Sequence, residues 1–590
     1  MANDITVSNT GAGTFTISGS VVNAGNDMTY TGTGTILLSG AHSGVGDVIK
    51  TGSNTMDVTS TYANTGALEI REGTVHVRGV NGRFNSSDNS IGPVSASVYC
   101  GATLILDSTD DEGNNRINND TNIRLYGGNF QAIGADPSQA DVSETFGDFT
   151  LAQDYSRVTI TLNATTEAYR LRSDSGNMTS LRSEGSTLLV EGANLGENSF
   201  DRTVGTPNDN TAVFVMATAP TLFTASGATA ASSRADLNRN TVAILPYAIG
   251  DDTTDSAVAA FLTYINDDTT SAPGDQNDLG LTLLTTYETD IRNASADENV
   301  SQNNDRSLNN NETMNSLRLT GSGTDITQSG SRTLTINSGG LLATAANQTI
   351  TVTNLSFNNQ EGHIFGWGSG TTLDINAVIQ NSPGVSINDG TISFSGSSAN
   401  TYTGETYVNQ GTLRLNKTAG VDAIASGDVI VHCGGTLLLA NNNQINDSVN
   451  MTLDGGTFDT DGFDDELGTL TLTATSTIDL GAGDSILRFA NSSGELWNPD
   501  AQLFITNWSG QTGGGGTDQI YFGTDTTGLT AQQLSQIFFI DPLGFAPGIY
   551  NITQLSTGEL APFPNPKPTP PFPCFFSSSS GGNDDASSPA

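Results

Sequence analysis

The chain alternates apolar and polar residues in short runs, and most runs follow a glycine and a threonine or serine. The clearest runs occupy residues 13–17, 34–38, 73–77, 101–106, 185–190, 370–375, 435–439, 456–458 and 468–472. Alternation with a period of two indicates β-strands, and the intervening Gly, Asn, Asp and Ser residues supply turns. The pattern therefore predicts an all-β chain built from many short strands.

One longer unit occurs twice. Residues 65–77 recur as residues 403–415 at a constant offset, with Thr-Gly at the start and Gly-Thr before the last strand of each copy. A unit of this length cannot bury its apolar face alone, so its repetition predicts stacking on similar neighbours.

Either β-sandwiches in series or one parallel β-helix would accommodate many short strands. Asn-Gly and Asp-Gly hairpin signals are sparse relative to the number of strands, which disfavours sandwiches. Recurring Thr, Ser and Asn favour a solenoid, where like residues stack between coils about 4.8 Å apart. With about 20 to 25 residues in each coil, we expect about 20 coils in one rod about 100 Å long.

Residues 400–415 closely resemble the autotransporter-associated β-strand repeat, with an Asn-Thr-Tyr-Thr-Gly turn and a Val-Asn-x-Gly-Thr-Leu finish. Residues 49–56 match the start of that unit. More loosely, residues 182–195 are similar to a segment of large bacterial repeat proteins that carry the unit without a translocator barrel. The resemblance implies a right-handed β-helix that is exported and displayed at the surface, with no catalytic residues attached to the repeat.

Differences in composition and in the density of the strand pattern divide the chain into five expected regions. These are N-terminal coils (1–107), an irregular middle with insertions (108–316), C-terminal coils (317–500), a C-terminal cap (501–560) and a disordered tail (561–590). In the middle region, the apolar runs 242–247 and 257–264 predict strands of an irregular coil or insertion.

The two ends of the expected solenoid differ. Residues 530–539 predict a helix with Thr530 as N-cap and Leu534 and Ile537 on one face, as part of a cap. Residues 562–571 are rich in proline and predict polyproline II outside any sheet. The chain enters directly as strand at 5–7, so we expect an open N-terminal edge and head-to-tail filaments of the protein with itself.

Charge excludes several functions. Twenty-one Lys and Arg face 62 Asp and Glu, a net charge of −41, and the three lysines are Lys50, Lys417 and Lys567. Without clustered cations, nucleic acid is not expected as a partner.

No apolar run reaches the roughly 20 residues of a membrane span, and the first residues carry no secretion-signal pattern, which leaves the export route open.

Three cysteines, Cys100, Cys433 and Cys574, are too few and too scattered for a disulfide framework, and no Cys-x-x-Cys pair suggests a metal site. We expect Cys100 and Cys433 to be buried apolar side chains. Cys574 lies in the proline-rich tail and is expected to be exposed, where it could crosslink neighbours.

The densest acidic cluster is residues 459–466, whose oxygens could suit calcium, although its spacing matches no EF-hand or β-roll motif. We expect a solvated turn there, with a calcium site as the alternative, and the same for Asp251-Asp252 and Asp267-Asp268. The histidines form no metal-binding motif and are expected on surfaces or in ladders: His42, His76, His363 and His432.

Aromatic and amide residues offer weaker signals. Trp367, Trp497 and Trp508 could stack on sugars if exposed, whereas Trp367, flanked by two glycines, is expected to fill the core. The Asn-x-Ser/Thr sites at Asn163 and Asn347, like the one at Asn507, are expected by chance in this composition. They carry no function unless the host glycosylates.

No base, nucleophile or cofactor motif emerges, so we assign no catalytic, cofactor-binding or metal-binding residue and expect no enzyme activity or cofactor. The lysines needed as a lyase base lie away from the acidic clusters, and paired glycosidase carboxylates cannot be identified from sequence. The leading hypothesis is a non-enzymatic extracellular or cell-surface scaffold or adhesin. The alternative is a carbohydrate-binding or polysaccharide-degrading β-helix enzyme.

Overall fold

The computed structural model is a β-solenoid of about 19 turns, which confirms the predicted all-β, parallel stacked architecture. It describes residues 4–85, 92–110, 116–134, 142–163, 168–176, 178, 180–197, 211–223, 230–231, 234–254, 259–266 and 279–566.

Each coil of the first half contributes one strand to each of several parallel sheets, because the chain turns at Gly, Asn and Asp and returns one layer further on. One sheet contains β1 (Ile5–Asn9), β4 (Met28–Gly32), β7 (Val48–Lys50), β10 (Leu68–Ile70), β12 (Ser95–Tyr99), β14 (Asn122–Tyr126) and β17 (Phe149–Gln153). A second contains β2 (Phe15–Ile17), β5 (Ile36–Leu38), β8 (Thr55–Val58), β11 (Gly73–Val77), β13 (Ala102–Asp107), β15 (Asn129–Ile133), β18 (Tyr155–Thr161), β20 (Thr187–Gly192), β22 (Leu245–Asp252), β23 (Ala260–Ile265) and β24 (Gly280–Leu283). The third face contains β3 (Val21–Val22), β6 (His42–Gly44) and β9 (Tyr62–Asn64), and later β16 (Val142–Phe146), β19 (Ala168–Ser173) and β21 (Thr211–Met216).

The second half is organised around a 22-stranded sheet. Its strands are β25 (Asn299–Gln302), β26 (Arg306–Leu308), β27 (Glu312–Met314), β28 (Ser316–Leu319), β29 (Asp325–Gln328), β30 (Thr333–Ile336), β31 (Gly340–Ala343), β32 (Gln348–Ser356), β33 (Gly362–Gly366), β34 (Thr372–Gln380), β35 (Gly384–Gly396), β36 (Glu405–Lys417), β37 (Val429–His432), β38 (Gly435–Leu439), β39 (Met451–Asp454), β40 (Thr457–Asp459), β42 (Leu470–Ala474), β43 (Ser476–Asp479), β45 (Leu503–Thr506), β47 (Ile537–Ile540), β48 (Ile549–Gln554) and β49 (Leu560–Pro566). A smaller sheet holds β41 (Asp465–Leu467), β44 (Ile486–Phe489) and β46 (Gln519–Phe522), and the helical segments are η1 (Arg234–Asn238) and α1 (Ala531–Gln536).

The register gives the coil length. Met28 pairs with Val48 and Val48 with Leu68, a repeat of 20 residues, while Thr406 pairs with Val429 and Val429 with Met451, repeats of 23 and 22 residues. These values lie in the expected range. Inward residues of successive coils therefore stack directly on one another and form a continuous apolar core.

Acidic residues at the turns form ladders of their own. The Asp27 Oδ1 accepts the Asp47 N–H at 2.9 Å, and the Asp47 Oδ1 accepts the Ala67 N–H at 2.8 Å in the next coil. A carboxylate in such a ladder satisfies a backbone donor that the turn leaves unpaired. Part of the high acidic content therefore serves the solenoid itself.

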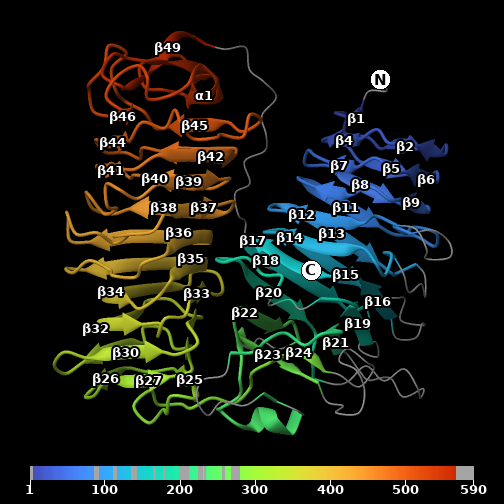
Figure 1. Cartoon of the computed structure of the whole chain (residues 1–590), viewed down its shortest axis with the longest axis horizontal. Coiled ribbons are helices and arrows are strands. Elements are labelled where there is room, and N and C mark those ends of the chain that lie inside the picture. Colours follow the sequence, from blue (N-terminus) through green and yellow to red (C-terminus); the bar gives the residue numbers. More distant parts are fainter. Residues whose placement is uncertain are drawn as a thin grey trace, which may run out of the picture.

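The expectation of a single rod is wrong. Figure 1 shows two stacks of coils side by side, the first running down the page from β1 and the second running up to β49. Their apolar cores are separate clusters. The first stack ends where β22, β23 and β24 pair antiparallel, because antiparallel strands cannot continue the parallel winding.

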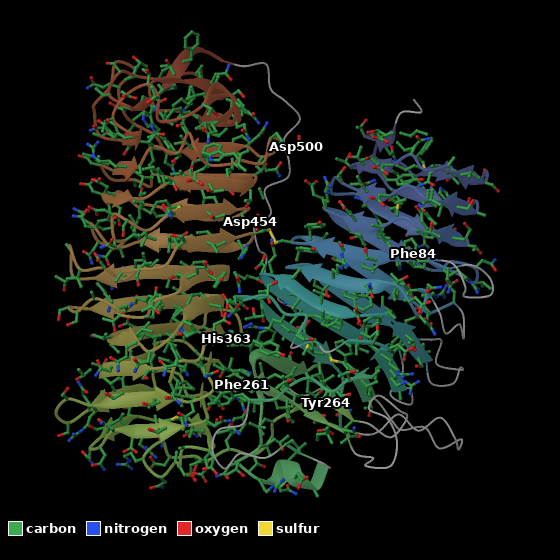
Figure 2. All side chains as sticks on the ribbon, viewed as in Figure 1. Phe84, Phe261, Tyr264, His363, Asp454 and Asp500 are labelled. Atoms are coloured by element: carbon green, nitrogen blue, oxygen red, sulfur yellow. A yellow bond between two sulfur atoms is a disulfide. The ribbon has the colours of Figure 1, made fainter. Side chains whose placement is uncertain are left out.

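An apolar outer face explains why the stacks lie together. Leu189, Ile249 and Phe261 of the first stack cluster with Leu342 and Phe365 of the second, and all are buried. Residues 242–247 and 259–264 of the two apolar runs build the region where the chain passes from the first stack to the second, which we call the turnaround; Phe261 in Figure 2 marks it. Covering outward apolar side chains removes them from water, which favours the folded-back arrangement over one rod.

The C-terminal end is covered by α1 and the antiparallel strands β47, β48 and β49. Thr530 caps α1 as predicted, with its hydroxyl accepting the Gln533 N–H at 3.2 Å and the Gln533 side chain accepting the Thr530 N–H. The predicted helix is too long, however, because Ile537 turns extended and pairs with Leu503 in β45.

The polyproline prediction is also wrong at its start. β49 pairs antiparallel with β48, with Ile552 opposite Pro562 and Tyr550 opposite Pro566. Proline is tolerated here because β49 is an edge strand, where the missing N–H is not needed by a further neighbour. Residues 567–590, including Cys574, lie outside the described residues.

The repeated unit places its second glycine at a tight turn in both copies. Gly73 and Gly411 have φ of +69° and +75°. A Cβ at Gly411 would lie 2.4 Å from the Gly390 oxygen of the preceding coil, and one at Gly73 would lie 2.4 Å from the Asn54 oxygen. The spacing between coils thus requires glycine at these positions.

We predict that Gly411→Ala lowers the free energy of unfolding by more than Gly420→Ala. Gly420 has a similar φ of +76° but open space around it, so its substitution carries only the left-handed backbone cost of about 1–2 kcal/mol. Gly411→Ala adds a steric clash with the Gly390 carbonyl of the preceding coil. Chemical denaturation followed by circular dichroism measures both, and equal losses would contradict the close-contact explanation.

Candidate functional site

Polar side chains of both stacks meet along the contact between them, which we call the seam. Its polar side chains come from Cys100, Gln153, Asp154, Arg182 and Thr187 of the first stack and from Glu361, His363, Asn388, Asn409, His432, Cys433 and Asp454 of the second.

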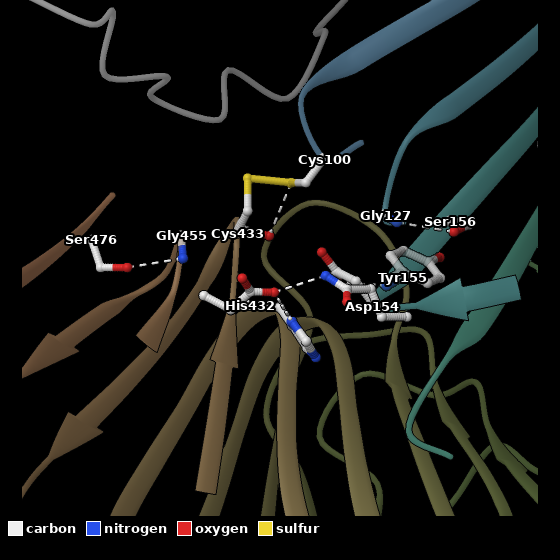
Figure 3. The surroundings of a disulfide bond; sticks show 11 residues. Cys100, Gly127, Asp154, Tyr155, Ser156, His432, Cys433, Gly455 and Ser476 are labelled. Carbon is white, nitrogen blue, oxygen red and sulfur yellow. Dashed lines mark hydrogen bonds and ion pairs between the residues drawn. A yellow bond between two sulfur atoms is a disulfide. The ribbon is translucent and has the colours of Figure 1, made fainter. Parts of the chain in front are cut away.

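A disulfide joins the stacks covalently. Cys100 follows β12 and Cys433 follows β37, and their Cα atoms are 6.0 Å apart (Figure 3). The expectation of two unpaired, buried cysteines is therefore wrong, and both residues are only half-buried. The sequence separation of 333 hid the pair, because only the folding back of the second stack brings the two cysteines together.

Beside the disulfide lies a buried ionisable cluster (Figure 3). The His432 Nδ1 lies 2.9 Å from the Asp454 Oδ2, and the Gln153 side chain donates to the same carboxylate at 2.8 Å. Asp154 is almost fully buried, and burial raises its pKa to about 7. Burial lowers the pKa of His432, but the bond to Asp454 and the charges of Asp154 and Asp454 outweigh it and raise the pKa overall.

Amide and hydroxyl groups continue the seam below this cluster. The Thr187 hydroxyl donates to the Asn388 Oδ1 at 2.5 Å, and the Asn409 amide donates to that same oxygen at 2.8 Å. Asn409 also donates to the Gly185 carbonyl at 2.8 Å. Gly185 itself packs against the ring of Tyr407, which leaves no room for a Cβ.

An arginine completes the seam near the turnaround. The Arg182 Nη2 lies 2.6 Å from the Glu361 Oε2, and its guanidinium carbon lies 4.5 Å from the centroid of the Tyr247 ring. The other Glu361 oxygen accepts the Gly185 N–H at 2.7 Å. Burial raises the pKa of Glu361, while burial and the Arg182 charge hold the pKa of His363 well below 6.5. These groups border a hollow of about 420 Å³.

Sequence reasoning did not single out Arg182, Glu361 or Gln153 as site residues. Residues 182–195 attracted attention only through their resemblance to bacterial repeat proteins, and Arg182, Gly185 and Thr187 of that segment contact the second stack. No pattern signals the pairing, because its members lie about 180 to 300 residues apart.

The remaining histidines occupy ladders or the core. His76 lies between two carboxylates of adjacent coils, with Nδ1 3.2 Å from the Asp57 Oδ1 and Nε2 3.0 Å from the Asp107 Oδ2. Burial lowers the pKa of His76, but these partners outweigh it and raise the pKa to about 9. His42 is buried and stacks on Tyr62 with ring centroids 5.2 Å apart.

The acidic cluster at 459–466 is only partly a solvated turn. Asp465 is 2 % exposed and accepts the N–H groups of Gln444 at 2.9 Å and Ile445 at 3.2 Å, and burial raises its pKa to about 7. Burial also raises the pKa of Asp459 to about 6, with Asp479 and Asp461 adding to the shift. Asp465 thus supports the neighbouring coil, whereas Asp459 accepts the Asp461 N–H within its own turn.

Other acidic and amide candidates are dispersed. Burial and the Glu191 and Asp252 charges raise the pKa of Asp251 to about 6. Asn347 and Asn507 occupy left-handed turns. Among the described residues, no group of three or more His, Cys, Asp or Glu gathers as a metal site. Asp267 and Asp268 lie outside the described residues.

The tryptophans pack rather than project. Trp508 is 1 % exposed and contacts Phe539, and Trp497 is buried and donates its indole N–H to the Leu470 carbonyl at 2.9 Å. Trp367 is half-buried against the apolar cluster between the stacks. Trp497 and Trp508 thus lie in the core, whereas Trp367, for which the core was expected, is only half-buried.

Comparison of the chain with known proteins found no matching family model, no matching curated protein and no matching solved structure. No helix in the described part of the chain is long and apolar enough to cross a membrane. The class that the fold defines is thus a two-stack β-solenoid joined by a disulfide.

We predict that Cys100→Ser/Cys433→Ser lowers the stability of the joined stacks without unfolding either one. A crosslink over so long a loop removes unfolded-state entropy worth about 5 kcal/mol. Denaturant midpoints should fall for this variant and equally for the native protein under reducing agent. Cys574→Ser is the control and should match the native protein, whereas labelling of Cys100 by a thiol reagent before reduction would disprove the bond.

We predict that Asp154→Asn removes a pH-dependent loss of folding stability that the buried Asp154 carboxyl causes at the seam. The folded pKa of about 7 lies above the ordinary value near 4, so stability present at low pH is lost as pH rises through about 4 to 7. At pH 8 the variant should be more stable than the native protein by on the order of 3 kcal/mol, and at pH 4 the two should agree.

Denaturation curves between pH 4 and pH 8.5 test this difference, with Asp500→Asn at an exposed turn as the control. The control should follow the native pH dependence. A constant difference between Asp154→Asn and the native protein across this range would contradict a buried titrating carboxyl.

Proposed function

We propose that this protein is a non-enzymatic scaffold or adhesin of the cell surface or extracellular space. The observation that carries this proposal is the seam, where Arg182 bonds Glu361 and Gln153 bonds Asp454 across the stacks. His432 pairs with the same Asp454 within the second stack. Groups held in this way favour a rigid body, since these polar side chains find their partners inside the protein.

Two features support a location outside the cell. Disulfides persist in oxidising compartments and are rare in the cytosol, so the Cys100–Cys433 bond favours secretion or surface display. The resemblance of residues 400–415 to the autotransporter-associated repeat points the same way. The net charge of −41 favours solubility at high local concentration.

A carbohydrate-binding or carbohydrate-degrading role is the second candidate, favoured by the hollow at the seam. Tyr247 lines this hollow, with the Arg182 guanidinium over its ring, beside the polar groups of Gln360 and Glu361. Aromatic rings with a few convergent polar groups suit sugar binding. Glu361 is the one carboxylate among the lining residues, whereas an ordinary glycosidase needs two.

A panel of neutral and acidic polysaccharides separates the two functions. We predict that incubation with the purified protein yields no new reducing ends and no unsaturated uronides. Products that appear with the native protein and vanish with Glu361→Gln would establish the enzyme instead. Antibody labelling of intact producing cells tests the location, and labelling only after permeabilisation would contradict surface display.

A further inference from the structure

The disulfide divides the chain into one closed loop and two arms. Cys100 and Cys433 are 333 positions apart in the sequence, and their bond closes residues 101–432 into a loop. The segment before Cys100, which we call the N-terminal arm, contains β1 to β12. The segment after Cys433, the C-terminal arm, contains β38 to β49 and α1. In Figure 1 both arms extend upward from the level of β12 and β37, and the closed loop lies below that level.

Almost the whole seam belongs to the closed loop. Apart from the two cysteines and Asp454, all the seam side chains named above lie between Cys100 and Cys433 in the sequence. The apolar cluster between the stacks also lies within the loop, since its buried residues run from Tyr155 to Phe365. The residues that line the hollow run from Arg182 to His363. One covalent bond therefore encloses the region where the two stacks hold each other.

The coils of an arm are held to one another by noncovalent contacts alone. The Met28 N–H donates to the Asp47 carbonyl at 2.9 Å, and the Val48 N–H donates to the Ala67 carbonyl of the next coil at 2.8 Å. Each such bond contributes only about 1 kcal/mol to stability. Because a coil contacts only its neighbours, tension that enters an arm loads the coils in turn, and they unwind one after another.

Tension that passes from one arm to the other bypasses the closed loop. The force follows the shortest covalent path, which crosses directly from Cys100 to Cys433 over a Cα–Cα distance of 6.0 Å. Residues 101–432 carry none of this force while the bond is intact. The bond is covalent, so it outlasts the hydrogen bonds and apolar contacts of the arms.

We propose that the Cys100–Cys433 disulfide is a mechanical stop, which lets the two arms unwind under tension and keeps the seam folded. The inference rests on the proposed role as a surface scaffold or adhesin, since a protein that links a surface to another body bears tension. The arms supply extension, and the seam with its hollow keeps its shape under load. The residues before Cys100 and after Cys433 together extend to about 900 Å when fully stretched.

Reduction releases this stop. Both cysteines are half-buried, so a small thiol can reach the bond. Its thiolate attacks one sulfur and forms a mixed disulfide, and the other cysteine leaves as a thiolate; a second thiolate then frees the first cysteine and becomes disulfide-bonded to the reagent. Tension now enters residues 101–432, whose unwinding adds about 1,100 to 1,200 Å. The fully stretched chain is thus more than twice as long in a reducing medium.

Force spectroscopy of the full chain, held by its two ends, tests the proposal. Without reductant, we expect extension to stop at about 900 Å, and dithiothreitol should then add at least ~1,100 Å to the same molecule. Cys100→Ser/Cys433→Ser should reach the longer length without reductant, and circular dichroism establishes that its coils form. Cys574→Ser is the matched control, because it removes a cysteine and leaves the bond, and it should stop where the native protein stops.

The time course after reduction reports whether the seam was folded under load. At constant force, a folded loop releases its length in several stages as its coils unwind, whereas a loop that has already unfolded releases it all at once. Three outcomes would overturn the proposal: extension of the native chain beyond the stop without reductant, a stop that persists in the double-serine variant, or release in a single step on reduction. None of these depends on where the protein is displayed or on polysaccharides, so this inference and the proposed function can fail separately.

Discussion

Each coil of this solenoid buries the apolar surface of only the coils next to it. The arrangement of the rest of the structure follows from this constraint. Within a stack, each inward side chain is buried by its counterparts above and below, and each strand pairs with the strands of the adjacent coils. Where the stacking stops, the core must be covered by something else. After the last coil of the second stack, α1 and the antiparallel strands β47, β48 and β49 do this.

The same need to cover apolar surface accounts for the folding back at β22–β24. Leu189, Ile249 and Phe261 project from the outer face of the first stack and are buried only because the second stack lies over them. Once the stacks are adjacent, the ionisable residues between them lose their water and need partners. The His432–Asp454 and Arg182–Glu361 pairs satisfy that need, and the disulfide makes the arrangement permanent in an oxidising environment.

Together these features describe a body whose buried charges are used for rigidity. Asp465 accepts backbone N–H groups of a neighbouring coil, and His76 bridges two carboxylates of adjacent coils. Lys50 directs its ammonium to the carbonyls of Thr51, Gly52 and Glu72. Because many acidic side chains are buried in such positions, the pKa values of many carboxyl groups differ from their ordinary values. In the part of the chain that the structure describes, these side chains do not form a group of three or more potential metal ligands.

Local features were predictable because they depend on neighbours in sequence or one coil away. Alternation and turn residues determined the strands, the repeated Gly-Thr spacing determined the stacking, and Thr530 determined the start of α1. The sequence did not predict where α1 ends, nor that Pro562 pairs in a sheet. Both features depend on pairing with a strand that is adjacent in the structure. The seam was decided only by tertiary structure. Cys100 and Cys433, like Arg182 and Glu361, belong to coils that meet because the chain reverses, and one-dimensional periodicity carries no information about which outer faces will pack together.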